Sequence, residues 1–269
     1  MMLADFQKSK RKAFIPFVVA GYPSLKDSEK VIDILVKEGA DLIELGVPFT
    51  DALADGPVIQ NASEKAAREN ITLNDVLELS QTLRKKYPSL GLVLFSYFNP
   101  IFKMGLDVFS KKSKIGGLDA VLCVDLPPEE SILYREILKK NDIGTVFLAS
   151  PTTIEKRLTL IEEASSEFIY YVSRTGVTGT RSELSPTLEK ELKKLRSQVK
   201  KPLAVGFGIS NGKQTVQVAP FVDGIVVGSA FVKLTQDPDL DRVLNQVGVL
   251  AREIKLACGT HHLYEILSL

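Results

Sequence analysis

The stretch PLAVGFGISNGKQTVQVAPFVDGIVVGSA, residues 202–230, decides between the two folds that the sequence allows. Its two apolar runs, 202–208 and 222–230, are too continuous for strands with one wet face, and they predict parallel strands buried on both faces. Each run leads into a glycine turn of the kind that lets an anion approach the backbone. Barrels commonly hold phosphate after their last two strands, whereas doubly wound sheets carry a glycine fingerprint after the first strand, so this stretch favours a barrel.

Runs of the same kind recur along the whole chain, separated by segments with helical spacing. The eight runs are AFIPFVVAG (13–21), DLIELGVPF (41–49), GLVLFSYF (91–98), DAVLCVDLPP (119–128), GTVFLAS (144–150), EFIYYVS (167–173), PLAVGFG (202–208) and VDGIVVGSA (222–230). Strand followed by helix, repeated eight times, predicts a (β/α)8 TIM barrel, with a doubly wound open sheet as the alternative. We therefore expect an α/β chain with a single domain over residues 1–269.

The helical segments show where this barrel departs from a plain repeat. Those with clear amphipathic spacing, expected to cover the sheet, are 26–40, 129–142 and 184–199. After the second run two helical segments, 57–69 and 73–86, stand in place of one. We expect extra helices there and at the N-terminus, a closing helix near the C-terminus, and a mobile lid at the Gly/Thr/Ser-rich loop 174–185.

The bulk composition excludes several classes of protein. Lys+Arg 34 against Asp+Glu 33 leaves a net charge of +1, which gives no bulk attraction to nucleic acid or to an anionic membrane. No apolar run approaches the roughly 20 residues that span a bilayer, and the N-terminus lacks the apolar core of a signal peptide. Cys123 and Cys258 are interpreted as a packing thiol and a surface thiol, which fits a cytoplasmic protein better than a disulfide framework does.

Three carboxylates cluster in IELGVPFTDALADGP, residues 43–57. Glu44 lies within the second strand near its C-terminal end, where barrels place their active sites, and burial there should raise its pKa toward neutrality. That property suits a general acid/base, although a structural glutamate bonded to nearby loops is the alternative. Asp55 is either the N-cap of the next helix or a site residue on a shaped loop over the barrel mouth. Asp51 is interpreted as turn-forming.

The glycine turns after the sixth, seventh and eighth runs predict an anion site. The residues that would let an anion approach the backbone are Gly179, Gly208, Gly228 and Ser229. Such turns on three consecutive strands of a predicted barrel indicate a substrate that carries phosphate. Any single turn would be weak evidence.

The chemistry is further limited by what the runs lack. None of the eight runs contains a lysine for a Schiff base, and the only histidines, His261 and His262, lie in the C-terminal tail. No Cys/His/carboxylate group has metal-ligand spacing, so we expect no metal. The sequence therefore points to proton transfer by carboxylates on a small phosphorylated substrate, in an isomerisation or a carbon–carbon cleavage.

With these residues assembled, the chain resembles the alpha subunit of tryptophan synthase along nearly its whole length. The matching segments are ELGVPFTDALADGPVIQ (44–60), YYVSRTGVTG (170–179), GFGIS (206–210) and GSAFVK (228–233). The resemblance implies a lyase of tryptophan biosynthesis that cleaves indole-3-glycerol phosphate to indole and glyceraldehyde 3-phosphate. It also implies no cofactor in this chain, a beta-subunit partner that holds pyridoxal phosphate, and an α2β2 complex.

The resemblance further assigns roles to individual residues. Glu44 and Asp55 match the catalytic pair, Glu44 for the proton transfers of the retro-aldol step and Asp55 as acceptor for the indole N–H. Residues that match substrate-binding positions are Phe17, Tyr97, Tyr170, Thr178, Gly179, Gly208, Gly228 and Ser229. Phe17 and Tyr97 are expected to line the indole pocket, Tyr170 to lie beside the glutamate, and Thr178 to meet the aspartate when the lid closes.

One departure from the family pattern concerns the loop that carries the aspartate. The family usually has PFSDP where this chain has PFTDA, so Thr50 replaces serine and Ala52 replaces proline. Loss of the proline frees a backbone torsion in a loop that, in the family, also touches the beta subunit. Two other functions stay open from sequence: a catalytically silent alpha-like subunit that only activates a beta partner, and another phosphate-binding barrel isomerase.

Overall fold

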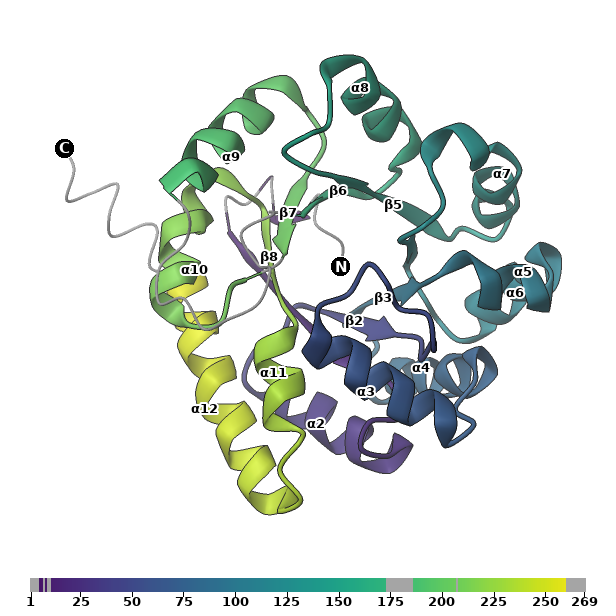
Figure 1. Ribbon diagram of the computed structural model, residues 1–269, viewed down its shortest axis with the longest axis vertical. Coiled ribbons are helices and arrows are strands. Elements are labelled where there is room, and N and C mark those ends of the chain that lie inside the picture. The colour runs from purple at the N-terminus through teal and green to yellow at the C-terminus, as the bar shows by residue number, and fades with distance from the viewer. Residues whose placement is uncertain (1–4, 7, 9–10, 173–185, 207, 260–269) are drawn as a thin grey trace.

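Eight parallel strands close into a barrel in the order β1 to β8. The computed structural model describes residues 5, 6, 8, 11–172, 186–206 and 208–259. The strands are β1 (Ala13–Val19), β2 (Leu42–Gly46), β3 (Gly91–Ser96), β4 (Ala120–Cys123), β5 (Gly144–Ala149), β6 (Phe168–Val172), β7 (Leu203–Gly206) and β8 (Gly224–Val227). The predicted (β/α)8 barrel is confirmed, and each apolar run supplies one strand (Figure 1).

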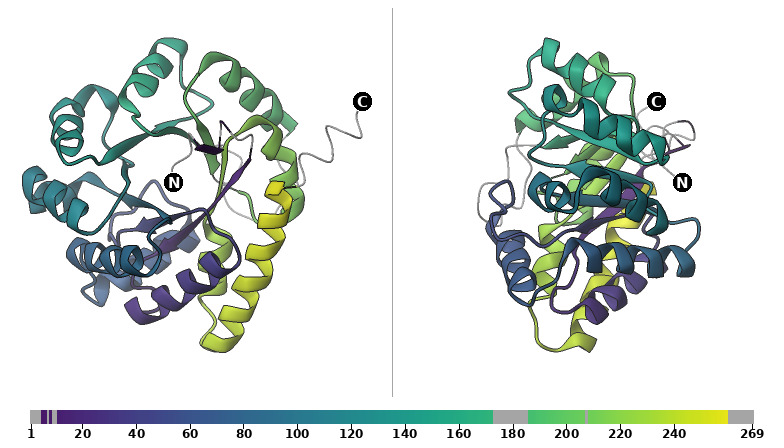
Figure 2. Two further views of the ribbon diagram at one scale, coloured as in Figure 1. Left: turned by 180° about the vertical axis from the view of Figure 1, so that it is seen from behind. Right: turned by 90° about the vertical axis from the view of Figure 1, so that its right-hand side faces the viewer.

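Helices surround the ring of strands (Figure 1 and the left view of Figure 2). They are α2 (Leu25–Lys37), α3 (Pro57–Arg68), α4 (Leu73–Lys86), α5 (Phe98–Met104), α6 (Leu106–Ile115), η1 (Pro128–Glu130), α7 (Ile132–Lys140), α8 (Glu155–Ala164), α9 (Pro186–Gln198), α10 (Gly212–Val218), η3 (Ala219–Phe221), α11 (Ser229–Leu234) and α12 (Leu240–Gly259). The two helices expected after β2 and the closing helix are present. Of the expected N-terminal helix, the described positions 5, 6 and 8 are helical.

The sequence prediction was wrong about the segment after β3. The apolar run appeared to continue to residue 98, but β3 ends at Ser96, and Tyr97 is the N-cap of α5. Two helices, α5 and α6, follow β3, for which the sequence analysis named no helical segment. Gly105 separates α5 from α6 with a φ of 83°, in the left-handed region that glycine adopts without a steric penalty.

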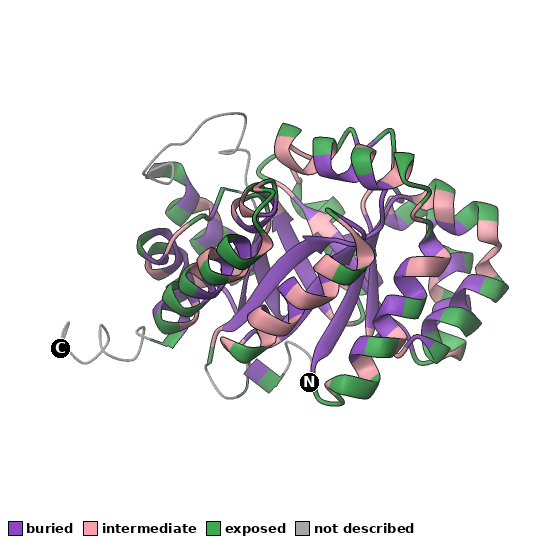
Figure 3. Cartoon of the chain, turned by 90° about the horizontal axis from the view of Figure 1, so that it is seen from below, coloured by how far each residue is buried: buried purple, intermediate pink, exposed green. Residues whose placement is uncertain are grey.

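Buried side chains form one layer inside the ring and another between the ring and the helices. Figure 3 shows that the strands are buried along their length, whereas the helices mix buried and exposed residues. The alternation of strand side chains assigns Leu42 to the inner layer and Ile43 and Leu45 to the outer one. Glu44 therefore faces the inside, in register with Phe17 of β1 and Val93 of β3. A carboxylate is thus held in the apolar centre of the barrel.

At the amino-terminal ends of the strands, side chains tie each odd strand to the even strand after it. Asp41 accepts the backbone N–H of Phe14 at 2.8 Å, Asp119 that of Leu92 at 2.7 Å, and Asp223 that of Leu203 at 2.9 Å. Ser166 accepts the N–H of Thr145 at 2.8 Å in the fourth pair. We call these four contacts the strand clamps.

Cations complete three of the strand clamps. Lys255 contacts Asp41 at 2.6 Å, Arg84 contacts Asp119 at 2.6 Å, and Arg196 contacts Asp223 at 2.9 Å. These hydrogen bonds are charge-assisted and partly shielded from water, which makes them stronger than exposed ion pairs. The clamps therefore reinforce the end of the barrel opposite to the one that barrel enzymes use for catalysis.

Two further expectations concern cysteine and membrane. Cys123 is buried as predicted, but Cys258 is also buried, at 4% exposure, so its interpretation as a surface thiol was wrong. It lies on the face of α12 that packs on the barrel, where a small apolar thiol fits. None of the helices in the described part of the chain is long and apolar enough to cross a membrane.

Candidate active site

Glu44 is fully buried on β2, and no described residue donates a hydrogen bond to either of its carboxylate oxygens. Burial in this apolar setting raises its pKa to about 8, from an ordinary value of 4.5. The sequence predicted this direction because a glutamate between Ile43 and Leu45 has little chance of reaching water. At neutral pH the side chain is therefore mainly protonated and able to donate a proton.

Asp55 does not cap helix α3, so the alternative interpretation of Asp55 as an N-cap was wrong. The N-cap is Gly56, and no hydrogen bond from a side chain is described there. The Asp55 carboxylate instead accepts a hydrogen bond from the Tyr97 hydroxyl at 2.9 Å. Burial raises the pKa of Asp55 to about 6, and the hydrogen bond from Tyr97 opposes part of that rise.

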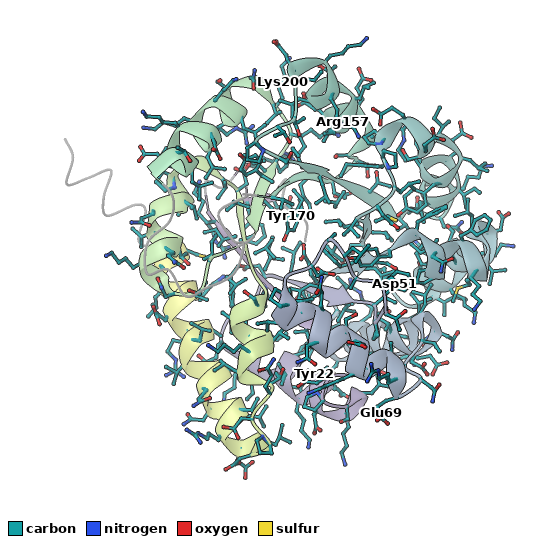
Figure 4. The ribbon with its side chains drawn as sticks, viewed as in Figure 1. Tyr22, Asp51, Glu69, Arg157, Tyr170 and Lys200 are labelled. Atoms are coloured by element: carbon teal, nitrogen blue, oxygen red, sulfur yellow. The ribbon has the colours of Figure 1, made fainter. Side chains whose placement is uncertain are left out.

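Tyr170 on β6 lies close enough to Glu44 and Asp55 for the charges of both carboxyl groups to act on it. Its side chain is buried, and Figure 4 shows it inside the ring of strands. Burial raises the pKa of its hydroxyl, and the nearby charges of Glu44 and Asp55 raise it further. The fold therefore brings together residues from β2, from the β2–α3 loop and from β6, as the sequence-based assignment of these three residues requires.

Two strand glycines that sequence reasoning missed make room for aromatic rings. A Cβ at Gly206 would collide with the Tyr170 hydroxyl and ring, and a Cβ at Gly46 would lie 2.5 Å from the end of the Phe17 ring. Glycine within a strand often marks such a close approach, and this signal was available in the sequence. Phe17 packs edge-on against Phe95 with ring centroids 5.1 Å apart. These rings form an apolar wall inside the barrel.

The loop between β2 and α3 is restrained by side chains from two neighbouring elements. Gln60 donates to the carbonyl of Ala52 at 3.1 Å, and Ala54 N–H donates to the Tyr97 hydroxyl at 2.9 Å. Asp51 is exposed in a turn, as predicted. These bonds restrain the segment in which Ala52 stands where the family usually has proline.

The glycine turns after β7 and β8 lie next to each other because these two strands pair. Gly208 has a φ of 82°, and a Cβ there would meet nothing within 4 Å among the described residues. Gly228 is the N-cap of α11, and no side-chain cap is described at that helix end, whose first residue, Ser229, is exposed. A Cβ at Gly228 would lie 3.4 Å from the Phe17 ring. The Gly228 turn therefore adjoins the apolar wall.

Two predicted site residues, Thr178 and Gly179, and the predicted lid at 174–185 lie outside the described residues. Within the ranges that are described, no group of three or more His, Cys, Asp or Glu side chains is placed to hold a metal ion. The described site consists of two carboxyl groups with raised pKa values, an apolar aromatic wall and adjoining glycine turns. Such a site can move protons on a substrate that has a flat apolar part and an anionic part.

Comparisons with known proteins agree along nearly the whole chain. A family model described as tryptophan synthase alpha chain matches residues 3–258. The tryptophan synthase alpha chain of Aquifex aeolicus is 40% identical over 252 residues, which cover 93% of this chain and 95% of that one. The alpha chain of Geotalea daltonii is 44% identical over 230 residues, covering 86% and 87%.

Solved structures give the same result. The tryptophan synthase alpha subunit of Legionella pneumophila strain Paris superposes with a TM-score of 0.88 at 33% identity, covering 96% of this chain and 97% of that one. A chain from a Pyrococcus furiosus structure, described as the basis of mutual activation of the tryptophan synthase α2β2 complex, gives a TM-score of 0.85 at 32% identity. It covers 91% of this chain, and 98% of its own length is matched.

Proposed function

This chain belongs to the tryptophan synthase alpha chain family, and from that membership we propose how its own residues perform the family's reaction. It is the lyase subunit that cleaves indole-3-glycerol phosphate to indole and glyceraldehyde 3-phosphate in tryptophan biosynthesis. The observation that carries the residue assignment is Glu44, a fully buried carboxyl whose oxygens receive no hydrogen bond from any described residue. Burying such a group without a hydrogen bond lowers the stability of the folded state, and proteins keep groups of this kind mainly at functional sites.

Glu44 is assigned both proton transfers of the cleavage. With a pKa of about 8 it is protonated at neutral pH and can donate a proton to the ring carbon C3 that carries the side chain of the substrate. The resulting carboxylate can then take the proton from the C3′ hydroxyl as the carbon–carbon bond breaks. The electron pair of that bond returns to the ring, so indole leaves, and an aldehyde forms on the glycerol phosphate part.

Asp55 is assigned to the indole nitrogen. Protonation of the ring carbon places positive charge on the N–H group, and an ionised carboxylate nearby stabilises that charge. The pKa of about 6 leaves Asp55 mainly ionised at neutral pH, in contrast to Glu44. Two carboxyl groups with separated pKa values support distinct roles for an acid and an anion.

The remaining assignments follow the shape of the substrate. The wall formed by Phe17 and Phe95 suits the flat indole ring, and Tyr170 lies beside the carboxyl groups. The phosphate is assigned to the turns at Gly208, Gly228 and Ser229, where backbone N–H groups can approach an anion. Thr178 and Gly179 complete this proposal from the family resemblance.

Replacing each carboxyl group tests the catalytic assignment. Glu44→Gln and Asp55→Asn should each lower the rate of indole release by at least the roughly 10²–10⁴-fold typical of a lost general acid or base. Circular dichroism and thermal unfolding of the same samples check that the barrel is intact. A folded variant with near-parental turnover would remove that residue from the mechanism. Activity that disappears in both variants also argues against a catalytically silent subunit.

The relatives include chains from tryptophan synthase complexes, which supports a beta-subunit partner for this chain. We propose that it assembles into an α2β2 complex in the cytoplasm, and that pyridoxal phosphate belongs to the partner.

Exposed apolar side chains follow four consecutive strands, β2 to β5, at the carboxyl end of the barrel. They are Leu53, Phe102, Ile132, Leu133 and Ile154, which we call the apolar rim. We propose that the beta subunit covers side chains of the apolar rim, because exposed apolar surface often marks a contact with a partner.

A further inference from the structure

Tyr97 makes more contacts with the Asp55 loop than a pocket-lining aromatic requires. Its hydroxyl donates to the Asp55 carboxylate at 2.9 Å and accepts the Ala54 N–H at 2.9 Å. Its ring stacks on Phe49, with centroids 5.0 Å apart and planes 30° apart. The side chain is 6% exposed and stands at the N-cap of α5, immediately after β3. A single residue from a neighbouring strand therefore holds the catalytic loop at three points.

The two hydrogen bonds of the hydroxyl have different effects. The bond from Ala54 N–H fixes the backbone next to Asp55, which restricts where the carboxylate lies. The bond to the carboxylate is charge-assisted and favours the ionised form over the neutral one. Both effects act on the group that the proposed function assigns to the indole nitrogen, and neither is supplied by a phenylalanine of the same shape.

We propose that Tyr97 is a positioning residue for cleavage, whose hydroxyl fixes the Asp55 carboxylate at the indole nitrogen and keeps it ionised. This inference rests on the proposed function of Asp55. It differs from the role that the resemblance gave to Tyr97, which was to line the indole pocket. Apolar contact with indole uses the ring alone, whereas positioning of Asp55 uses the hydroxyl.

Other ionisable groups around this pair act on the tyrosine or on the cluster as a whole. Burial raises the pKa of the Tyr97 hydroxyl, and the charges of Asp55 and Asp125 raise it further, so it stays protonated and remains a donor. Tyr170 feels the charges of Glu44 and Asp55 from the barrel interior. Among the described groups, Tyr97 is the side chain that lowers the pKa of Asp55.

The test compares Tyr97→Phe with Tyr87→Phe. The control removes the same kind of bond, because the Tyr87 hydroxyl donates to the Asp33 carboxylate at 2.8 Å, but it does so at the end of α4. Two readouts need no catalysis: the hydrogen-exchange rate of the Ala54 amide, and the pKa of Asp55 from carboxyl ¹³C NMR. A third is the pH profile of kcat/KM for indole release.

In Tyr97→Phe we expect faster exchange at Ala54 and a higher pKa for Asp55. We also expect kcat/KM to fall roughly ten- to a hundredfold, the usual result of losing a hydrogen bond to a charged group. Activity should be lost on the acid side at a higher pH than in the parent, because protonation of Asp55 then begins at a higher pH. Tyr87→Phe should show none of these changes.

An unchanged Ala54 exchange rate or an unchanged Asp55 pKa in Tyr97→Phe would overturn the proposal. So would a fall in kcat/KM with the acid limb at its parental pH, because that pattern means a damaged pocket. The proposed function can fail separately: if Asp55→Asn keeps its activity while the Ala54 and Asp55 readouts respond to Tyr97→Phe, Tyr97 positions Asp55 but Asp55 is not catalytic.

Discussion

At the scale of single residues, the central carboxyl determines how stability should respond to pH. The pKa of Glu44 is about 8 in the folded chain against 4.5 for an ordinary glutamate, so between these pH values the folded state holds a proton that the unfolded state has released. The free energy of unfolding therefore contains a contribution that falls as pH rises from 4.5 to 8. Below pH 4.5 the folded and unfolded states both hold this proton, so Glu44 no longer makes the free energy of unfolding depend on pH.

Glu44→Gln should remove this pH dependence. We expect the variant to gain stability relative to the parent as pH rises, by up to about 5 kcal/mol above pH 8, because the parent alone must ionise a buried group or unfold. Urea unfolding at pH 5, 7 and 9 measures the difference. Glu136→Gln, a change at an exposed glutamate of α7, is the control. Equal slopes in Glu44→Gln and the parent would mean that Glu44 reaches water in solution.

The surroundings of a residue could be predicted where the residues that form them are close to it in sequence. The pKa of Glu44 could be anticipated because its apolar neighbours are adjacent along the chain. The contact between Tyr97 and Asp55 could not, because these residues are 42 positions apart and a hydroxyl leaves no periodic signal. The N-cap interpretation of Asp55 was wrong for a related reason: Gly56 takes the cap, and the aspartate turns to a distant tyrosine.

At the scale of elements, the apolar runs predicted all eight strands because strands buried on both faces leave an uninterrupted signal. The end of β3 was misplaced because Tyr97 and Phe98 continue that signal beyond the last strand residue, Ser96. Aromatic side chains that face a pocket or pack under a short helix are as apolar as those of a strand. Pattern alone therefore could not locate the α5 boundary.

The turn after β7 gives a prediction at this scale. Gly208→Val should weaken binding of glycerol phosphate by about tenfold or more, as expected when roughly one hydrogen bond to the backbone is lost. Binding of indole should change little, because the aromatic wall is formed by other residues. Gly105→Val is a matched control, since Gly105 also has a left-handed φ, of 83°, and also meets nothing described within 4 Å. Calorimetric titration with each ligand measures both affinities.

Equal losses for indole and glycerol phosphate in Gly208→Val would contradict the phosphate assignment. That result would mean that strain at the positive φ had disturbed the whole pocket. A similar loss of glycerol phosphate binding in Gly105→Val would lead to the same conclusion, because that glycine lies between α5 and α6 on other elements.

At the scale of the whole molecule, the apolar rim is the surface that we expect the beta subunit to cover. Leu53 is 86% exposed and lies two residues before Asp55, so a subunit that covers it also bears on the catalytic loop. Leu53→Asp should lower the affinity for the beta subunit at least tenfold and reduce the gain in indole release on mixing, because a charge would be buried without a partner. Ile115→Asp is the control, at a 67% exposed position where α6 ends.

Titration of each variant with a beta subunit, followed by indole release, measures both quantities. Parental affinity in Leu53→Asp would exclude this part of the rim from the contact. Equal weakening in Ile115→Asp would mean that added charge, and not its place on the barrel, disturbs assembly. If the parent itself gains nothing from a competent beta subunit, the proposed assembly is wrong.

The strand clamps lie at one end of the barrel, whereas Glu44 lies inside the ring and the Asp55 loop follows the carboxyl end of β2. Residues that hold the ring together are therefore separate from residues that act on the substrate, and selection can act on the two sets independently. Insertions or substitutions in the loops at the catalytic end leave the aspartates of the strand clamps and their cations in place. An ancestral chain of this design could acquire new specificity while keeping the same scaffold.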